Sequence, residues 1–292
     1  MSSVLEVRQV SKAYGRTDAV DSLNMDLAEH TIYGLLGRNG AGKTTFLNMI
    51  TGGIFPDGGE IAVHGNLLKK GDVPTQTCYI REKNFYPNNA RVRDVLQMAA
   101  AFHPDWDAKF ASKLLGTFKL NPRKKMRQLS RGMESMVGNL IGLASRAPLT
   151  IFDEPVLGLD VLMRERFYRM LIEDYAEHPR TILLSTHLID EIATVVEQVF
   201  IMESGSILMH EEVEQIRDRA HMISGLGAGL DHFLQGRRVI HGERYGNAGM
   251  AVVYGELTEH DHREAASQGL TIEGVPLQKF FAYLIEEGQT DE

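Results

Sequence analysis

A glycine-rich run near the amino terminus has the residue types and spacing of a phosphate-binding loop. Residues 37–44 read Gly-Arg-Asn-Gly-Ala-Gly-Lys-Thr and fit the pattern G-x-x-x-x-G-K-[ST]. Glycines let the backbone curl so that its N–H groups point at anionic oxygens, and a helix that follows adds the positive end of its dipole. The alternative is a glycine-rich turn with a coincidental lysine. The nucleotide-binding candidates of the loop are Gly37, Arg38, Asn39, Gly40, Ala41, Gly42, Lys43, Thr44 and Thr45.

Two side chains of this run have specific expected roles. We expect Lys43 to reach the outer phosphates of a nucleotide, because its charge sits at the start of the helix. We expect the Thr44 hydroxyl to ligate Mg²⁺, since hydroxyl and carboxylate oxygens are ligands that this cation prefers.

Two carboxylates end a buried-strand pattern farther along the chain. Residues 149–152 are apolar apart from one threonine, and Asp153, Glu154 and a proline follow. Doubly wound sheets place their ligands at the carboxyl ends of parallel strands. We expect Asp153 to hold Mg²⁺ through water and Glu154 to take a proton from an attacking water. The alternative is an acidic pair that the dipole of the next helix favours.

Two further side chains could contact a nucleotide. His187 follows an apolar run at 181–185, and at such a strand end it could donate a hydrogen bond to a γ-phosphoryl group. Tyr14 follows a short strand pattern, and its ring could stack on adenine. The alternatives are a structural histidine and an ordinary hairpin tyrosine.

Ser130 and Gly132 precede a helical pattern at 137–144, and a capping hydroxyl with free backbone N–H groups makes a second potential anion site. The basic run at 123–127 just before them is typical of a solvated helix face. His260 and His262 lie close together, but their i, i+2 spacing does not put both on one helical face, so we expect no metal site there.

The elements that must position these residues alternate between strand and helix. Apolar periodicity predicts strands at 4–10, 22–27, 31–36, 60–63, 77–80, 149–153, 181–185 and 199–202, a turn at 11–15, and helices at 45–50, 161–175 and 188–196. Helical spacing dominates from about 85 to 145 and predicts a mostly helical insert. After residue 213, strand patterns near 222, 239 and 251 alternate with helical patterns at 226–234, 259–267 and 276–286, which predicts a small α/β extension.

The composition limits the classes of function. The 292 residues are 43% hydrophobic and have a formal net charge of −8, which argues against nucleic acid as a partner because phosphate neutralisation needs a basic face. Cys78 is the only cysteine, so no intramolecular disulfide can form. There is no signal-peptide pattern and no run of 18 apolar residues. We therefore expect another chain to supply any membrane-spanning part.

Taken together, these motifs resemble those of an ABC-type ATPase domain. Residues 37–45 resemble the Walker A motif of that family, residues 129–133 its signature sequence and residues 151–154 the end of its Walker B motif. Residues 158–160 resemble its D-loop and His187 its switch histidine. The resemblance covers about the first 210 residues. It implies an α/β P-loop NTPase fold of ABC type with an antiparallel β subdomain, with residues 1–213 as the ATPase domain and residues 214–292 as the extension.

The resemblance also implies how such a chain works. Two ATPase domains pair head to tail as a homodimer or heterodimer, and they bind ATP and Mg²⁺ between them. The signature then acts in trans on the partner's nucleotide, and the D-loop contributes Asp160. The signature residues of this chain are Ser130, Arg131, Gly132 and Met133. The expected function is an ATP-hydrolysing motor subunit on the cytoplasmic, inner face of the cell membrane that drives a separate permease.

This chain departs from the family pattern at several positions. The usual LSGGQ signature has Arg131 in place of a glycine and Met133 in place of the glutamine. Glu82 stands where the family has a glutamine after the strand at 77–80, and it would join Thr44 and Asp153 as a metal ligand. These departures and the carboxyl-terminal extension resemble the antibiotic and multidrug exporter branch, in particular YtrB-like subunits. Such signature changes also fit a heterodimer with one weaker site.

Two other functions stay open at this point. A regulatory ATPase could use ATP-gated dimerisation to control a soluble or ribosomal partner, and it would need no membrane segment either. A small-molecule kinase with a P-loop is the third possibility, but it leaves the residues at 130–133 and at 185–187 without a role.

Overall fold

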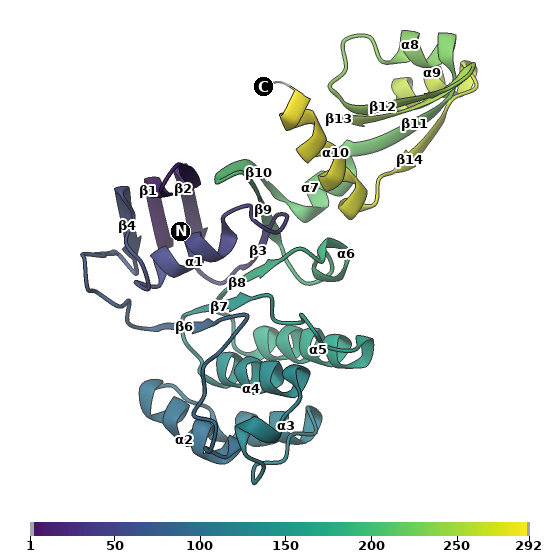
Figure 1. Ribbon diagram of the computed structural model, residues 1–292. Coiled ribbons are helices and arrows are strands. Elements are labelled where there is room, and N and C mark those ends of the chain that lie inside the picture. Colours follow the sequence, from purple (N-terminus) through teal and green to yellow (C-terminus); the bar gives the residue numbers. More distant parts are fainter. Residues whose placement is uncertain (1–2, 291–292) are drawn as a thin grey trace. The chain divides into compact units, whose positions relative to one another are not determined.

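In a computed structural model that describes residues 3–290, the chain forms two compact units (Figure 1). Unit 1 contains the residues up to His187 together with Val195–His210, and unit 2 contains Leu188–Thr194 and the chain from Glu211 onward. Each unit has a hydrophobic core of its own. The domain boundary predicted after residue 213 stays a prediction, whereas the packing of Leu188–Thr194 with unit 2 was not expected from the sequence.

A six-stranded sheet lies at the centre of unit 1, in the order β10-β9-β3-β8-β7-β6. Its strands are β3 (Ile32–Leu36), β6 (Thr77–Ile80), β7 (Leu149–Asp153), β8 (Thr181–Thr186), β9 (Gln198–Glu203) and β10 (Ser206–Glu212). The strands from β9 to β6 run parallel, and every residue of β3, β7 and β8 is buried, as in sheets covered on both faces. Leu36 pairs with Thr186 and Asp153 with Ser185. The carboxyl ends of three neighbouring strands therefore lie together.

A second sheet of unit 1 is antiparallel, in the order β2-β1-β4-β5. Its strands are β1 (Ser3–Tyr14), β2 (Thr17–Ala28), β4 (Gly58–Val63) and β5 (Asn66–Leu67). The turn predicted at 11–15 is wrong, because Lys12 pairs with Val20 and Tyr14 with Thr17, which leaves only Gly15 and Arg16 between the strands. Helix α1 (Lys43–Ile50) fills the core that both sheets share, with Phe46 and Leu47 fully buried.

Four further α-helices lie in the described part of unit 1, and Figure 1 draws α2, α3 and α4 together at the end remote from β1, β2 and β4. They are α2 (Val92–Phe102), α3 (Ala108–Thr117), α4 (Arg131–Ala144) and α5 (Val161–Glu177). Each of the last three begins after a side chain that accepts a hydrogen bond from its first turn: Asp107, Ser130 and Asp160. Polar N-caps thus fix where these helices start.

Unit 2 contains a four-stranded antiparallel sheet in the order β12-β13-β11-β14, with α8 and α9 packed on one face (Figure 1). Its elements are α6 (Ile189–Ile192), α7 (Val213–Arg219), β11 (Ala220–Leu226), α8 (Gly227–Phe233), β12 (Val239–Tyr245), β13 (Ala248–Tyr254), α9 (Glu259–Ser267), β14 (Thr271–Gly274) and α10 (Leu277–Thr290). The helix predicted at 188–196 was too long, because α6 contains only Ile189–Ile192. Helix α7 and strand β14 were not predicted, because each is short and β14 has a single apolar residue, Ile272.

Within residues 3–290, no helix is both long and apolar enough to span a lipid bilayer.

The close packing of α4 on the sheet predicts a stability difference between two glycines. A Cβ on Gly142 would lie 2.5 Å from Phe152 Cε1 and 2.9 Å from Ile80 Cγ1. Gly142→Ala should therefore lower the free energy of unfolding by about 1–3 kcal/mol. Gly116→Ala in α3 is the matched control, because no described heavy atom outside its own helix lies within 4 Å. It should raise the same quantity by up to about 1 kcal/mol. Urea unfolding followed by circular dichroism measures both, and changes of equal sign would contradict the packing argument.

Candidate functional site

Residues 37–42 form a tight loop between β3 and α1, and Lys43, Thr44 and Thr45 are the first residues of α1. Gly40 and Gly42 have φ angles of 89° and 104°, a region that favours glycine. Gly42 also lies against the backbone, since a Cβ there would come within 2.2 Å of the Ala19 carbonyl oxygen. The loop thus needs glycine for both conformation and space, which is the condition under which backbone N–H groups can turn towards one point.

Lys43 is the buried cation of the site, with 6% of its surface exposed. Its Nζ donates hydrogen bonds to the carbonyl oxygens of Gly37 at 2.6 Å and Arg38 at 3.1 Å. Burial lowers the pKa of Lys43, while the charges of Glu154, Asp153 and Glu203 act in the opposite direction. The ammonium is therefore held within the loop itself, where phosphate oxygens can replace carbonyl oxygens as its partners.

Thr44 and Asp153 meet across the edge of the sheet. The Thr44 hydroxyl donates to Asp153 Oδ2 at 3.0 Å, and the Tyr79 hydroxyl lies 3.4 Å from the same oxygen. Asp153 is 2% exposed, and its burial is the main reason that its pKa is raised. Among the described residues, Oδ1 of Asp153 has no hydrogen bond of good geometry, although the nearby Ser185 hydroxyl lowers the pKa of this carboxyl. A buried carboxylate oxygen without a partner, beside a hydroxyl, fits a divalent cation.

Glu154 is held by two neighbours from the end of β8. Its Oε2 accepts a hydrogen bond from the Thr186 hydroxyl at 3.1 Å, and Oε1 lies 2.8 Å from Nδ1 of His187. Its φ of 51° is a strained value for a residue with a side chain, and its N–H donates to the Ser185 carbonyl. A carboxylate only accepts hydrogen bonds, so the proton between these two side chains lies on His187 Nδ1. The other ring nitrogen, Nε2, is not used in this contact.

The signature residues and the D-loop pack against each other. Ser130 caps α4 by accepting a hydrogen bond from the Met133 N–H at 3.3 Å. A Cβ on Gly132 would lie 3.1 Å from the Gly158 carbonyl oxygen, so the two turns are in contact. Asp160 caps α5 by accepting from the Met163 N–H at 2.9 Å. Ser130, Arg131 and Asp160 are exposed.

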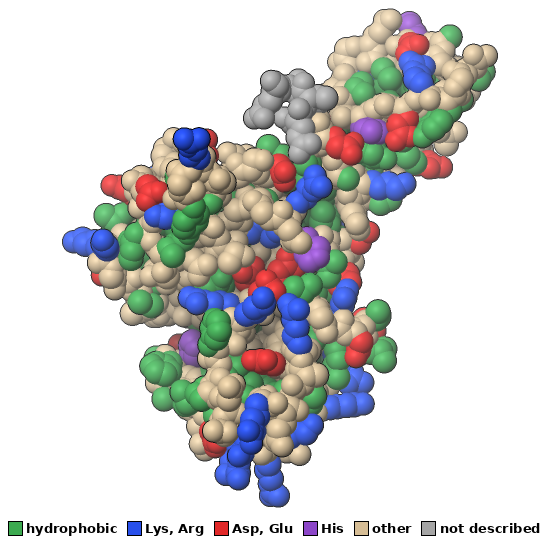
Figure 2. Space-filling model, in the orientation of Figure 1, with side chains coloured by type: hydrophobic (Ala, Val, Ile, Leu, Met, Phe, Trp, Pro, Cys, Tyr) green, Lys and Arg blue, Asp and Glu red, His purple; other side chains and the backbone are tan. Residues whose placement is uncertain are grey.

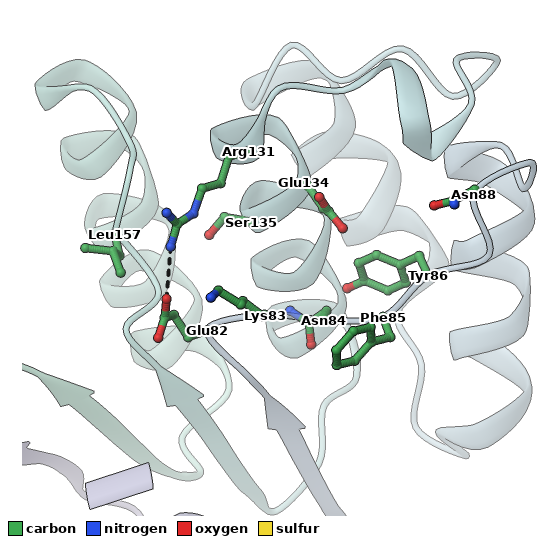
Figure 3. Close-up of a pocket in the computed structure, with 10 residues that line it drawn as sticks. All are labelled: Glu82, Lys83, Asn84, Phe85, Tyr86, Asn88, Arg131, Glu134, Ser135 and Leu157. Atoms are coloured by element: carbon green, nitrogen blue, oxygen red, sulfur yellow. Dashed lines mark hydrogen bonds and ion pairs between the residues drawn. The ribbon is translucent and has the colours of Figure 1, made fainter. Parts of the chain in front are cut away.

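Glu82 is paired with Arg131 rather than with Thr44 or Asp153. Arg131 Nη2 donates to Glu82 Oε1 at 2.9 Å. Figure 3 shows the two side chains meeting from the segment after β6 and the start of α4, beside Leu157. They line a cavity of about 270 Å³ to which Lys83, Tyr86 and Glu134 also contribute.

Tyr14 lies at the end of β1 with 53% of its surface exposed, and Lys12 Nζ lies 5.9 Å from its ring centroid. The ring is thus accessible to a planar base.

In unit 2, His260, Asp261 and Glu264 bring possible metal-ligand atoms within 4.8 Å of one another. Both oxygens of Asp261 are engaged, however, one by Arg237 at 2.6 Å and the other by Thr258. These hydrogen bonds, first of all the one from the Thr258 backbone, lower the pKa of Asp261. The cluster is accounted for as a helix cap with an ion pair.

Sequence reasoning missed Tyr79 and Thr186, which contact Asp153 and Glu154. Thr186 directly precedes the predicted His187, so its place at the end of a strand was a usable signal. Tyr79 gave no such signal, because its contact depends on the pairing of β6 with β7.

In Figure 2, Asp and Glu side chains gather near the middle of the visible face of unit 1, bordered by Lys and Arg side chains.

The chain is similar in sequence and fold to proteins of known families. A family model described as "ABC transporter" matches residues 20–157. The chain is 30% identical over 223 residues to the bacitracin transport ATP-binding protein BcrA of Bacillus licheniformis, covering 75% of this chain and 73% of that protein. It is 27% identical over 216 residues to the ABC transporter ATP-binding protein YtrB of Bacillus subtilis, covering 74% of each. A solved structure of an ATP-binding subunit of an ABC transporter matches with a TM-score of 0.67 and 27% identity, over 73% of this chain and 92% of that one.

The unequal surroundings of two buried aspartates predict opposite effects of removing their charge. Burial, helped by the charge of Glu154, raises the pKa of Asp153 although the Ser185 and Thr44 hydroxyls and the charge of Lys43 act in the opposite direction, so ionisation of this carboxyl opposes folding at pH 7. Asp153→Asn should raise the free energy of unfolding at pH 7 by about 1 kcal/mol. The gain should shrink as the pH falls through the pKa of Asp153, because the wild-type carboxyl then becomes neutral as well.

Asp174 is the matched control, since it is 3% exposed but paired with Arg146 and with Arg180 at 2.8 Å. Asp174→Asn should cost about 3–5 kcal/mol, because it leaves the buried Arg180 guanidinium without its carboxylate partner and leaves Arg146 with Asp107 alone. Denaturant unfolding at several pH values measures both variants. A loss of stability in Asp153→Asn at pH 7 would contradict this account of the site.

Proposed function

The chain belongs to the family of ABC transporter ATP-binding proteins, and from that membership we propose that it is the ATP-hydrolysing motor subunit of a bacterial exporter. The activity of the family is ATP hydrolysis, and its members bind ATP. The single observation that supports a hydrolytic site in this chain is the Glu154–His187 contact at the sheet edge where Thr44 meets Asp153.

ATP binding depends on the loop at 37–45. Its backbone N–H groups and Lys43 neutralise phosphate charge, and the ammonium exchanges the carbonyl oxygens of Gly37 and Arg38 for phosphate oxygens. Burial disfavours the charge of Lys43, so a triphosphate next to it recovers that cost. The exposed ring of Tyr14 stacks on the adenine.

Thr44 and Asp153 hold Mg²⁺, with Glu82 as a further oxygen ligand. When bound, the cation neutralises charge on the phosphates. Asp153 Oδ1 offers the oxygen that lacks a partner, while Thr44 gives up its hydrogen bond to Oδ2.

Glu154 acts as the general base. It accepts a proton from the attacking water, and its contacts with Thr186 and His187 fix the direction of the carboxylate. His187 holds its Nδ1 proton towards Glu154, which leaves Nε2 of a neutral ring as an acceptor. Donation from Nε2 to the γ-phosphoryl oxygens therefore requires the imidazolium form, in which both ring nitrogens carry a proton.

The site is completed by a facing subunit, which is a second copy or a related ATPase chain. Ser130, Gly132 and Met133 of that subunit contact the phosphates in trans, and its Asp160 lies at the contact. ATP favours the closed pair, and hydrolysis with phosphate release favours the open one. Exposure of Ser130 and Asp160 supports this arrangement, because such residues must be reachable by another chain.

The opening and closing drives a separate permease, with this chain on the cytoplasmic face of the cell membrane. We place the chain with exporters because BcrA, to which it is similar, is named for the transport of bacitracin, an antibiotic. The absence of a membrane-spanning helix in residues 3–290 is compatible with this role and equally with a regulatory ATPase.

Removing the proposed base gives a direct test of hydrolysis. Glu154→Gln should lower phosphate release by about 10²–10⁴-fold, because an amide cannot take the proton from water, while ATP affinity changes little. Glu173→Gln, at an exposed site on α5, is the matched control and should keep wild-type turnover. Wild-type turnover in the Glu154 variant would remove this residue from the role of base.

Affinity purification from membranes tests the partner. A tagged chain solubilised in mild detergent should recover a polytopic membrane protein. The complex that contains the Glu154→Gln chain should still not hydrolyse added ATP. Recovery of a soluble or ribosomal partner instead would favour the regulatory ATPase, and transfer of phosphate to an acceptor other than water would favour a kinase.

A further inference from the structure

Two charged residues that depart from the family pattern are paired with each other in this chain. Glu82 replaces a neutral glutamine and Arg131 replaces a glycine, and they are 49 positions apart in the sequence. Their contact is a single hydrogen bond of 2.9 Å between Nη2 and Oε1. Figure 3 shows that the guanidinium reaches from the first turn of α4 to the segment that follows β6.

The position of Arg131 gives the pair a physical reason. Arg131 is the first residue of α4, where the helix dipole is positive and a cation is unfavourable. Glu82 is the carboxylate that compensates this charge. Glu134, in the first turn of the same helix, and Lys83, beside Glu82, face the same cavity and are not in the ion pair.

The pair is also easily broken. The Arg131 side chain is 63% exposed and that of Glu82 is 37% exposed, so water and salt screen the attraction. Exposed ion pairs of this kind shift an equilibrium by about fivefold at most. A carboxylate has a much stronger attraction to a divalent cation at its own site, so Glu82 can exchange one positive partner for another.

We propose that the Glu82–Arg131 ion pair is a latch, in which Arg131 is a positioning residue that withholds the Glu82 carboxylate from the Mg²⁺ of bound ATP. The proposal rests on the proposed function, because it needs a nucleotide at the loop and Glu82 as a metal ligand. Mg²⁺ and Arg131 compete for one carboxylate, so occupation of the nucleotide site frees the guanidinium at the start of the signature helix. Binding of Mg²⁺ at the nucleotide is thereby linked to the release of Arg131, which lies in the segment that faces the partner subunit.

The competition predicts a change in binding that can be measured without hydrolysis. In the chain carrying Glu154→Gln to block turnover, Arg131→Ala should tighten the Kd for Mg·ATP by about two- to fivefold, because Glu82 then binds the cation without first giving up an ion pair. The Kd for ATP in EDTA should stay unchanged. Calorimetric titration of ATP with and without Mg²⁺ gives both values, and 0.5 M salt should remove the difference.

Three further variants make the result specific. Arg127→Ala, which removes another exposed arginine four positions earlier, should leave both Kd values unchanged. In a Glu82→Gln background, Arg131→Ala should have no effect on Mg·ATP binding, because the competition needs the carboxylate. All variants should melt within about 2 °C of the parent, since exposed substitutions cost little stability.

The outcomes separate the latch from the function on which it rests. If the parent chain does not bind ATP, the proposed function fails. If it binds Mg·ATP but Arg131→Ala leaves the Kd unchanged or weakens it, the latch is overturned. An effect that persists with Glu82→Gln would also overturn it and would mean that Arg131 acts on the metal or the phosphates directly.

Discussion

The parallel alignment of β3, β8 and β7 is the constraint on which the rest of the site depends. Leu36 and Thr186 are paired, as are Asp153 and Ser185, so the loop after β3 and the polar ends of the other two strands must open at one edge. Because all residues of these strands are buried, a shift in register would bring polar ends into the core. The contacts of Thr44 with Asp153 and of Glu154 with His187 follow from this alignment and from no single loop.

The same edge concentrates charge that the folded chain cannot fully compensate. Three carboxylates act on Lys43, and burial works against ionisation on both sides, since it lowers the pKa of the lysine and raises that of Asp153. Glu154 adds backbone strain through its positive φ. We therefore expect the folded chain to gain stability when a cation and phosphate oxygens bind at this edge, so that ligand binding and stability depend on the same few atoms.

The sequence predicted the parts of the site that lie within one motif. Gly37–Thr45, Asp153, Glu154 and His187 each sit at the end of an apolar run, and local periodicity is enough to find such ends. The Glu82–Arg131 pair could not be found in this way, because it joins segments 49 residues apart through the packing of α4 beside β6. Short elements were predicted poorly for a related reason. Strand β14 and helix α6 have four residues each, which is too few to show a repeat of apolar positions. Strand β14 forms by pairing with β11, which lies far away in the sequence.

Burial divides the predicted site residues into two groups, and the division has a physical reason. Lys43, Asp153 and Glu154 are almost fully buried and take their partners from their own chain, so their geometry is set before any ligand arrives. Ser130, Arg131 and Asp160 are exposed at the starts of α4 and α5, where two of them serve as helix caps. A cap holds its side chain still at little cost while leaving the first turn of the helix open. The residues that we propose meet a second chain are thus kept rigid by local hydrogen bonds, because no core can cover them.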